Sequence, residues 1–507
     1  MKLDLKAALN LIKEYWLLVV IVVAASWLRT WQLETQGILF GDAGKDLLTA
    51  YQAVTDGKWP LLGIESSVPR FRQGPLTLWL EMLLIKISGI HTLPIALVFA
   101  GLGIAAVIML YEWAALYLTP KVGVIATALL AFSPLAVAHS RVPYHTTPIP
   151  LVMIGFLFGL IHLWQGKRWG LLAAVLSWTL ILQFELSLFA LGLMIPYILW
   201  RQRVKLRVYH LSQAGAALLI GLSPQLIHDL SNPLAQNQVG GFLAWVGYRL
   251  ISVLGVTGEH SFSLNRLGET LGHFGQYLHR LYGVESVLFS GVFVFAAAWT
   301  GLMIFQRLQL KKAPTKSARK RPHLLPAIEI LAVSTFLLTT SYFVHGQPSE
   351  AYFPPYFVLL SLLLGWGLGE LADLIKSRFK FNGWALMGVA IAIWASLNMR
   401  AIWQQRFFVS NNSSFSYGAS TGEQRAILSY LDRLTDWRFY LASSDRDVPE
   451  SQYANFAWLA LEQGLQDQYS NPVLAELVFY VEAKDSSLST YPNITKVEFP
   501  TYDIYYH

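Results

Sequence analysis

Apolar residues are gathered in long blocks along most of the chain, and polar or charged residues are confined to the segments between these blocks. About eleven blocks have lengths near the roughly 20 residues that cross a bilayer as a helix. They are 15–28, 93–118, 121–138, 147–165, 169–184, 185–200, 210–228, 284–306, 324–344, 351–371 and 383–403. The first block follows a lysine-rich start and precedes no small-residue cleavage site, so we predict a retained first span. The pattern predicts an all-α polytopic membrane domain over residues 1–403.

The apolar segment from Gly74 to Gly89 is short and carries Glu81 and Lys86, so charge has to decide whether it crosses. If it does not cross, the basic clusters between the other blocks share one side with the N-terminal lysines, as the positive-inside rule requires. These clusters are Lys121; Lys167 and Arg168; Arg201, Arg203, Lys205 and Arg207; the run from Arg307 to Arg321; and Lys376, Arg378 and Lys380. We therefore predict a juxtamembrane or re-entrant helix here, with a cytoplasmic N-terminus and an extracytoplasmic C-terminus.

Three long polar regions then face outward, namely the loops 34–92 and 229–283 and a tail over residues 404–507. The spacing of apolar residues in the tail predicts four elements. They are a helix over 422–434, a strand over 437–442, a helix over 449–465 and a strand over 476–483. This order predicts a small α/β domain.

The composition supports a membrane protein and excludes several other classes. Of the 507 residues, 54% are hydrophobic and 14% are charged, whereas soluble domains carry about 25% charged residues. A cytosolic enzyme, a disordered scaffold and a nucleic-acid binder are thereby excluded, and the net charge of +7 has to be interpreted by its location. The chain has no cysteine, which rules out disulfides, thiolate metal sites and cysteine nucleophiles.

The first outer loop carries two carboxylates soon after the first span. Asp42 and Asp46 are four residues apart, so a helix that begins here presents both on one face, with Asp42 at its N-terminus. One interpretation is an N-cap aspartate with ordinary helix pairs. The other is a general base for a hydroxyl, assisted by Lys45, because partial burial raises the proton affinity of a carboxylate. The spacing alone leaves both open.

Two arginines lie further along the same loop. Arg70 and Arg72 precede Gly74 and Pro75, and a proline suits the first turn of a helix. Arginine at the headgroup level is commonly an interface anchor. Its planar, bidentate donor group also suits a lipid phosphate, so a phosphate clamp is the functional alternative.

These features together resemble the GT-C membrane glycosyltransferases. The similarity is to the branch that contains the dolichyl-phosphate-mannose protein mannosyltransferases and the lipid A aminoarabinose transferase. Bacterial members of this branch carry Asp-x-Gly-Lys/Arg-Asp ahead of Gly-Pro-Leu, which correspond here to Asp42–Asp46 and Gly74–Leu76. The resemblance covers residues 10–230 at the level of motifs and the remainder by topology.

The resemblance implies roles for particular residues. Asp42 falls on the catalytic carboxylate of the family and Lys45 on a basic residue, while Ala43 replaces the second acid that many members carry. The second outer loop along the chain is the short segment 138–148. It resembles the family segment Ser-Arg-x-x-x-Asp/Asn, with Arg141 as its arginine and His145 in place of the final acid or amide. His145 could orient the acceptor, bind phosphate or simply satisfy a neighbour.

The resemblance also implies roles for residues in two further segments. Gln183 and Glu185 lie at the end of the fifth span, where relatives often carry Gln-x-His. A sugar contact is the functional interpretation, and a partner for Arg141 or a plain helix-end residue is the structural one. His345 lies in a loop that contacts lipid phosphate in relatives.

The implied activity is transfer of a sugar from a polyprenyl-phosphate-linked donor to an acceptor hydroxyl of a lipid, glycan or protein, at the outer face of the membrane. Asp42 would be the catalytic base. The residues expected to bind acceptor or sugar are Asp46, His145, Gln183 and Glu185, and those expected to bind the lipid phosphate are Lys45, Arg70, Arg72, Arg141 and His345. No cofactor is expected, a divalent metal is left unassigned, and membrane lipids rather than nucleic acid are the other partners. The tail carries no assignable chemistry, so we expect it to influence acceptor choice rather than bond making.

Two rival functions remain. A transporter or lipid flippase would carry charged residues within its spans or paired, broken helices. Polar residues here concentrate at the outer rim, with Glu112 and Glu329 as isolated exceptions. A polysaccharide polymerase or ligase that uses lipid-linked sugars would share the proposed chemistry.

Overall fold

The computed structural model describes most of the chain. The residues outside its description are 1–4, 40, 67–69, 205–206, 232–239, 254–266, 284–286, 310–322, 345–348, 404–418, 436–437, 443–449, 467–468, 470–476, 484–494, 501 and 507. His345 and most of the basic run from Arg307 to Arg321 therefore lie outside the described residues.

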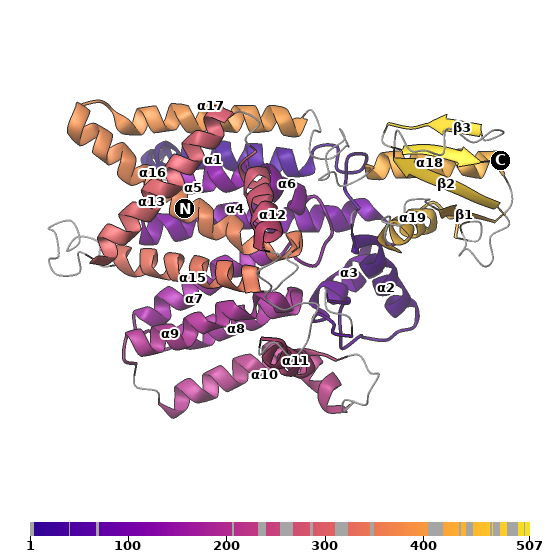
Figure 1. Ribbon diagram of the computed structural model, residues 1–507, viewed down its shortest axis with the longest axis horizontal. Helices are drawn as coiled ribbons and strands as arrows, with labels where there is room; N and C mark the ends of the chain where they lie inside the picture. Colours follow the sequence, from indigo (N-terminus) through magenta and orange to yellow (C-terminus); the bar gives the residue numbers. More distant parts are fainter. Residues whose placement is uncertain are drawn as a thin grey trace.

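The greater part of the molecule is a bundle of helices (Figure 1). Its members are α1 (Leu5–Thr30), α4 (Thr92–Tyr117), α5 (Pro120–Ala131), α6 (Pro134–Ser140), α7 (Ile149–Trp164), α8 (Gly170–Phe184), η1 (Leu186–Leu193), α9 (Met194–Arg201), α10 (Val208–Ser231), α13 (Val287–Gln309), α15 (Leu324–Val344), η3 (Glu350–Tyr352), α16 (Pro354–Phe379) and α17 (Gly383–Trp403). Each apolar block of the sequence coincides with one of these helices or with an adjoining pair. The expected all-α polytopic fold is confirmed.

Length and apolar composition qualify four of the described helices as membrane spans, namely α4, α15, α16 and α17. The bent pair α5 and α6 would count as a fifth. The remaining apolar helices have described apolar parts of 10–17 residues. The total of eleven spans therefore stays a prediction.

The bend between α5 and α6 has a local cause in the sequence. The two helices meet at 65°. Ser133 accepts a hydrogen bond from the backbone N–H of Ala136 at 3.2 Å, and Pro134 follows at the first helical position. A capping serine and a proline both start a new helix rather than continue an old one. The break turns α6 toward the end of the bundle and sets the direction of the following loop.

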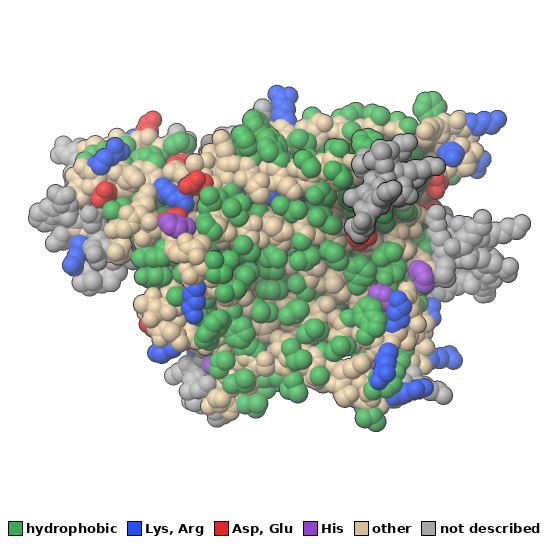
Figure 2. Space-filling model, turned by 180° about the vertical axis from the view of Figure 1, so that it is seen from behind, with side chains coloured by type: hydrophobic (Ala, Val, Ile, Leu, Met, Phe, Trp, Pro, Cys, Tyr) green, Lys and Arg blue, Asp and Glu red, His purple; other side chains and the backbone are tan. Residues whose placement is uncertain are grey.

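The surface of the bundle is what a lipid environment requires. Exposed apolar side chains cover the middle of the face seen in Figure 2. Lys and Arg side chains gather at the end of the bundle that lies opposite to the C-terminal domain. This separation of apolar and basic surface agrees with the positive-inside assignment.

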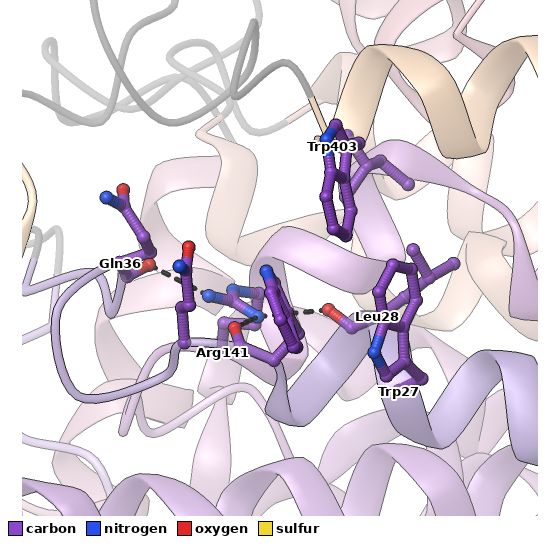
Figure 3. A pocket seen from close by; sticks show the side chains of 8 residues that line it. Trp27, Leu28, Gln36, Arg141 and Trp403 are labelled. Carbon is purple, nitrogen blue, oxygen red and sulfur yellow. Dashed lines mark hydrogen bonds between the residues drawn. The ribbon is translucent and has the colours of Figure 1, made fainter.

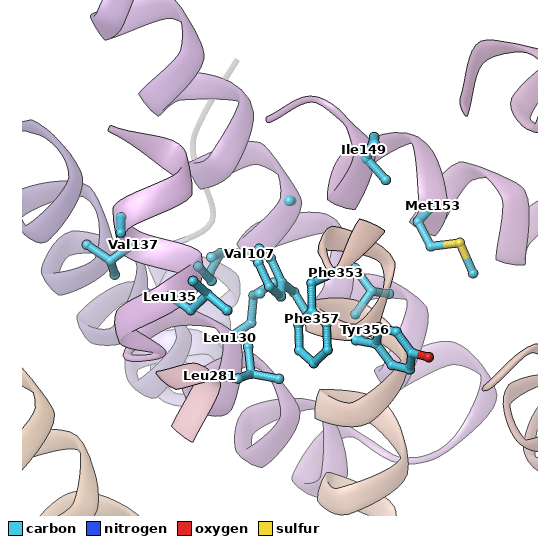
Figure 4. Close-up of a cluster of buried hydrophobic side chains, with 14 of the residues drawn as sticks. Val107, Leu130, Leu135, Val137, Ile149, Met153, Leu281, Phe353, Tyr356 and Phe357 are labelled. Carbon is cyan, nitrogen blue, oxygen red and sulfur yellow. The ribbon is translucent and has the colours of Figure 1, made fainter. Parts of the chain in front are cut away.

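Helices that are distant in the sequence share one apolar core. Figure 4 shows Leu130 of α5 and Val107 of α4 beside Phe353, which precedes α16, and Phe357 of α16, all buried. Leu281, from outside the predicted spans, lies in the same cluster. The outer segments are thus packed into the bundle rather than loosely attached.

Four described helices lie in the predicted outer loops and are α2 (Ala43–Thr55), α3 (Leu76–Ser88), α11 (Phe242–Val253) and α12 (Leu267–Tyr282). Helix α3 is the ambiguous apolar segment. Its 13 residues extend only about 20 Å, which is shorter than the roughly 30 Å hydrocarbon core of a bilayer. It lies with α2 at the same end of the bundle as the C-terminal domain (Figure 1).

The tail forms a small α/β domain, as predicted. Its elements are α18 (Thr421–Leu434), β1 (Phe439–Ala442), α19 (Glu450–Glu462), β2 (Leu477–Ala483), β3 (Thr495–Glu498) and β4 (Tyr502–Tyr506). The sheet has the order β1-β2-β4-β3, with β1 and β2 parallel and the other pairs antiparallel. Helix α19 is the crossover that parallel strands need. The strands β3 and β4 were not predicted from the sequence.

The orientation of the chain can be tested with single cysteines, because no native cysteine interferes. Thr49 on α2 and Ser377 near the end of α16 are both exposed and lie at opposite ends of the bundle. We expect Thr49→Cys to react with a membrane-impermeant maleimide from outside intact cells, and Ser377→Cys to react only after permeabilisation. Labelling in the reverse order would invert the assigned topology.

Candidate active site

Asp42 stands at the N-terminus of α2 with its carboxylate uncommitted to the helix. Gly41, at a φ of +56° that favours glycine, turns the chain into the helix. Asp42 occupies the N-cap position, is half-buried and makes no side-chain cap hydrogen bond. An aspartate at this position ordinarily accepts from the N–H groups of the first turn. Here the carboxylate is left for other partners.

Asp46 lies one turn further along α2 and is fully buried beside Glu81 of α3. Among the described atoms, neither oxygen of either carboxylate has a hydrogen-bond partner. Burial, followed by the charge of Asp42, raises the pKa of Asp46 well above its usual value, and burial with the charge of Asp46 does the same for Glu81. Burial and mutual repulsion both favour the protonated form of these carboxyls, so we expect the pair to hold at least one proton.

Tyr144 links the two outer loops at the centre of an acidic cluster. The carboxylates whose charges act on its phenol are Asp42, Asp46, Glu185 and Glu350. Burial, reinforced by these charges, raises the pKa of Tyr144 well above its usual value, so the hydroxyl stays protonated and can donate. The Tyr144 hydroxyl lies near the turn before α2, because a Cβ added to Gly41 in that turn would be 3.8 Å from the hydroxyl oxygen. The sequence pattern did not single out this residue.

His145 and Glu185 lie together in the second outer loop and at the end of α8. The His145 Nε2 is 3.7 Å from a Glu185 oxygen, and the His145 ring packs on Tyr144 with centroids 4.1 Å apart. Glu185 also accepts from Gln73 Nε2 at 3.2 Å and from the backbone N–H of Ser187 at 3.0 Å. Glu185 is therefore both a helix-end residue and a member of the acidic cluster, and its described partners do not include Arg141.

Gln183 faces a different neighbour. Its amide donates to the carbonyl of Gly221 at 2.7 Å and to Gln225 at 3.1 Å, so it joins α8 to α10. A Cβ added to Gly74 would lie only 1.8 Å from the side-chain oxygen of Gln183. Only glycine permits this approach, which gives the Gly-Pro-Leu segment a structural reason and fixes the start of α3.

Arg141 is buried at the end of α1, where it donates to the backbone carbonyls of Leu28, Trp31 and Gln36, each at 3.0 Å (Figure 3). A cation at a helix C-terminus satisfies the free carbonyls there. Burial lowers the pKa of Arg141 to about 10, so it remains charged at neutral pH. These bonds favour a structural role over the phosphate-binding role expected from the sequence.

The aromatic rings around Arg141 form an interfacial cluster. Trp403 of α17 stacks on Trp27 and Trp31, with centroids 5.0 and 5.3 Å apart. Together with Arg141 and Gln36 these rings line a small pocket at the end of the bundle (Figure 3). Tryptophans at this depth are typical anchors of the membrane interface.

The other expected phosphate ligands lie nearer to solvent. Lys45 is exposed, with its Nζ 3.8 Å from a Glu65 oxygen. Arg70 is exposed at the tip of a hairpin in which the N–H of Ser66 donates to the carbonyl of Phe71 at 2.7 Å. Arg72 is half-buried in the returning strand. Among the described residues no ion pair is recorded for either arginine, so both guanidinium groups are candidates to receive an anion.

An ion network that sequence reasoning missed borders this site. Glu350 pairs with Arg280 Nη1 at 2.6 Å and with His139 Nε2 at 3.0 Å, and all three side chains are buried. The amphipathic sequence of α12 is typical of a surface helix. Its C-terminal end differs from a surface helix, because Arg280, Leu281 and Tyr282 are all buried there.

No described group of three or more His, Asp or Glu side chains is arranged to hold a metal ion. The described site offers carboxylates, a phenol and an imidazole, which are groups able to transfer protons and to position a substrate.

Comparison with known proteins agrees with this fold. Residues 72–228 match the dolichyl-phosphate-mannose-protein mannosyltransferase family. The structure is similar to ArnT from Cupriavidus metallidurans bound to undecaprenyl phosphate, with a TM-score of 0.52, 12% identity and coverage of 96% of this chain and 97% of that one. The same values hold for ArnT in the apo state. No curated protein sequence matches the chain significantly.

The chain is a polytopic membrane protein with the GT-C type glycosyltransferase fold. The resemblance expected from the sequence is confirmed at the level of the fold. Within that fold, residues 72–228 match the dolichyl-phosphate-mannose-protein mannosyltransferase family, and 96% of the chain is similar in fold to ArnT.

Proposed function

We propose that this protein transfers a sugar from a polyprenyl-phosphate-linked donor to an acceptor hydroxyl at the outer face of the membrane, with Asp42 as the general base. The observation that carries the proposal is the uncapped, half-buried carboxylate of Asp42 at the outer end of a GT-C fold. The nearby acidic cluster around Tyr144 supports it.

The acidic cluster suits a base in two ways. The negative charges of neighbouring carboxylates favour proton uptake by any member that is ionised. The buried pair of Asp46 and Glu81 holds a proton already, so Asp42, which is half-buried, is the member placed to receive one from a substrate. Tyr144 would donate a hydrogen bond to the acceptor or to the sugar.

The proposed step balances as follows. The acceptor oxygen loses its proton to Asp42 and forms a bond with the anomeric carbon, while the bond from that carbon to the phosphate oxygen breaks. The electron pair of that bond leaves with the polyprenyl phosphate, whose negative charge grows in the transition state. Lys45, Arg70 and Arg72 are the accessible cations that would stabilise this charge. An in-line attack of this kind inverts the anomeric configuration.

Incubation of the purified protein with radiolabelled polyprenyl-phosphate sugars tests the proposal. We expect release of polyprenyl phosphate that depends on the protein and is abolished by heat denaturation. The matched control is the same protein with a nucleotide-linked sugar, from which no transfer is expected. Turnover of the nucleotide sugar, or no release of polyprenyl phosphate from any lipid-linked pentose or hexose, would contradict the proposal.

A further inference from the structure

The first turn of α2 is capped by a residue from the C-terminal domain. Helix N-termini leave backbone N–H groups without intrahelical partners, and the N-cap side chain usually accepts from one of them. Asp42 holds the N-cap position without doing so. The N–H of Gly44 instead donates to the side-chain oxygen of Asn455 at 2.9 Å. Asn455 belongs to α19, which lies against α2 (Figure 1).

The Asn455 amide holds the chain on both sides of Asp42. Its Nδ2 donates to the carbonyl of Leu39 at 3.3 Å, while its oxygen accepts from Gly44. One end of the amide faces an acceptor and the other faces a donor, so its orientation is determined by its partners. Asn455 is 3% exposed. A buried side chain with both polar ends satisfied fixes the turn that precedes α2.

Gly44 is required for this contact. A Cβ at this position would lie 2.5 Å from both the backbone nitrogen and the side-chain oxygen of Asn455. Any larger residue would therefore push α19 away from α2. The glycine within Asp42–Asp46 is explained by the approach of the C-terminal domain and not by a positive φ.

Other contacts dock the C-terminal domain independently of Asn455. Trp458 Nε1 donates to the hydroxyl of Thr92 at 2.9 Å, and Glu462 accepts from the N–H of Thr92 at 2.9 Å. Arg425 pairs with Glu462 at 2.9 Å and donates to the carbonyl of Glu34 at 2.7 Å. The domain can thus stay attached when a single one of these contacts is altered.

We propose that Asn455 is a positioning residue that caps α2 in place of Asp42 and so keeps the Asp42 carboxylate free to accept the proton of the acceptor. The inference rests on the proposed function. Without the Asn455 oxygen, Asp42 is the nearest group able to cap its own helix. A carboxylate that accepts backbone N–H bonds is a weaker base, so both its availability and its basicity fall. The C-terminal domain then contributes to bond making, beyond the influence on acceptor choice expected from the sequence.

The test compares Asn455→Ala with Asn455→Asp in the full-length protein, using the polyprenyl-phosphate sugar that the wild type accepts. Asn455→Ala should lower kcat by about 10-fold or more with the KM for the donor nearly unchanged, because loss of positioning acts on the reacting groups rather than on donor binding. The acid limb of its pH profile should move to lower pH. Asn455→Asp keeps the oxygen that accepts from Gly44 and loses only the donor to Leu39, so it should retain more of the wild-type kcat than Asn455→Ala. Its added negative charge should move the acid limb to higher pH.

Arg425→Gln is the matched control, since it loosens the same domain without touching Gly44 or Leu39. Its kcat and pH profile should stay close to wild type. The other titratable groups that act beside Asp42, namely Lys45, Asp46 and Tyr144, are unchanged in every variant, so opposite shifts of the acid limb report on Asp42. If Asn455→Ala does not fold, Asn455→Leu, of similar volume, replaces it in the comparison.

The outcomes separate the two levels of the proposal. A wild-type kcat in Asn455→Ala, or equal losses without any pH shift in Asn455→Ala and Arg425→Gln, would overturn the capping role. If Asp42→Asn also retains activity, Asp42 is not the base and the capping inference loses its ground, whereas no turnover of any polyprenyl-phosphate sugar by the wild type would show that the proposed function itself is wrong. If Asp42→Asn is inactive while Asn455→Ala is normal, only the capping inference fails.

Discussion

The Asp42→Asn variant should turn over a polyprenyl-phosphate sugar at least about 10²-fold more slowly than the wild type, which is the lower end of what a general base contributes. The amide has nearly the same shape as the carboxylate but cannot accept the proton of the acceptor hydroxyl. Folding and donor binding should be preserved, because Asp42 makes no cap hydrogen bond that the substitution would remove. The measurement is single-turnover kinetics alongside a donor-binding isotherm.

Asp46→Asn is the control on the same face of α2. Burial raises the pKa of Asp46, and an amide resembles the protonated carboxyl that this shift favours. Its cost in turnover should therefore be much smaller than that of Asp42→Asn. Near wild-type turnover in Asp42→Asn, or an equal loss in both variants, would remove Asp42 from the role of base.

Arg280→Ala should destabilise the folded protein by about 3–5 kcal/mol, the cost of leaving a buried charge without its partner. The substitution removes the 2.6 Å contact to Glu350 and leaves that carboxylate with His139 as its described ionisable partner. The effect should appear as a marked drop in the thermal unfolding temperature of the solubilised protein. It should also loosen α12 from the start of α16.

The matched control removes both charges at once. An Arg280→Met and Glu350→Gln double variant should recover much of the lost stability, because no uncompensated charge remains. Arg425→Ala breaks a less buried pair with Glu462 and should cost less than Arg280→Ala. Equal unfolding temperatures for wild type and Arg280→Ala would show that the network is not a stabilising element.

The helices of the bundle could be predicted because each one is specified by its own consecutive residues. A block of apolar residues near bilayer length has to hide its backbone polar groups in helical hydrogen bonds, whatever surrounds it. The positive-inside rule gave the prediction that α3 does not cross, and the spacing of apolar residues predicted the tail elements from α18 to β2. The short strands β3 and β4 escaped prediction, because strand formation depends on neighbours that the local pattern does not contain.

The site was predicted only in part. The motif spacing placed Asp42 and Asp46 on one helix and brought attention to His145 and Glu185, which the structure places around Tyr144. It could not show that Arg141 is bonded to the end of α1. A guanidinium group suits backbone carbonyls and phosphate oxygens equally, so its partner is decided by what the fold places beside it.

The sequence by itself determined the membrane class, the helical segments and the carboxylate at the start of α2, since hydropathy, helix signals and residue spacing are properties of consecutive residues. Only the tertiary structure decided which polar groups have hydrogen-bond partners and which residues provide those partners. Asn455 reaches Gly44 across 411 residues, and Glu81 lies beside Asp46 from another helix. Those contacts set burial, charge and hydrogen bonding around Asp42, and these are the quantities that make one carboxylate a structural cap and another a base.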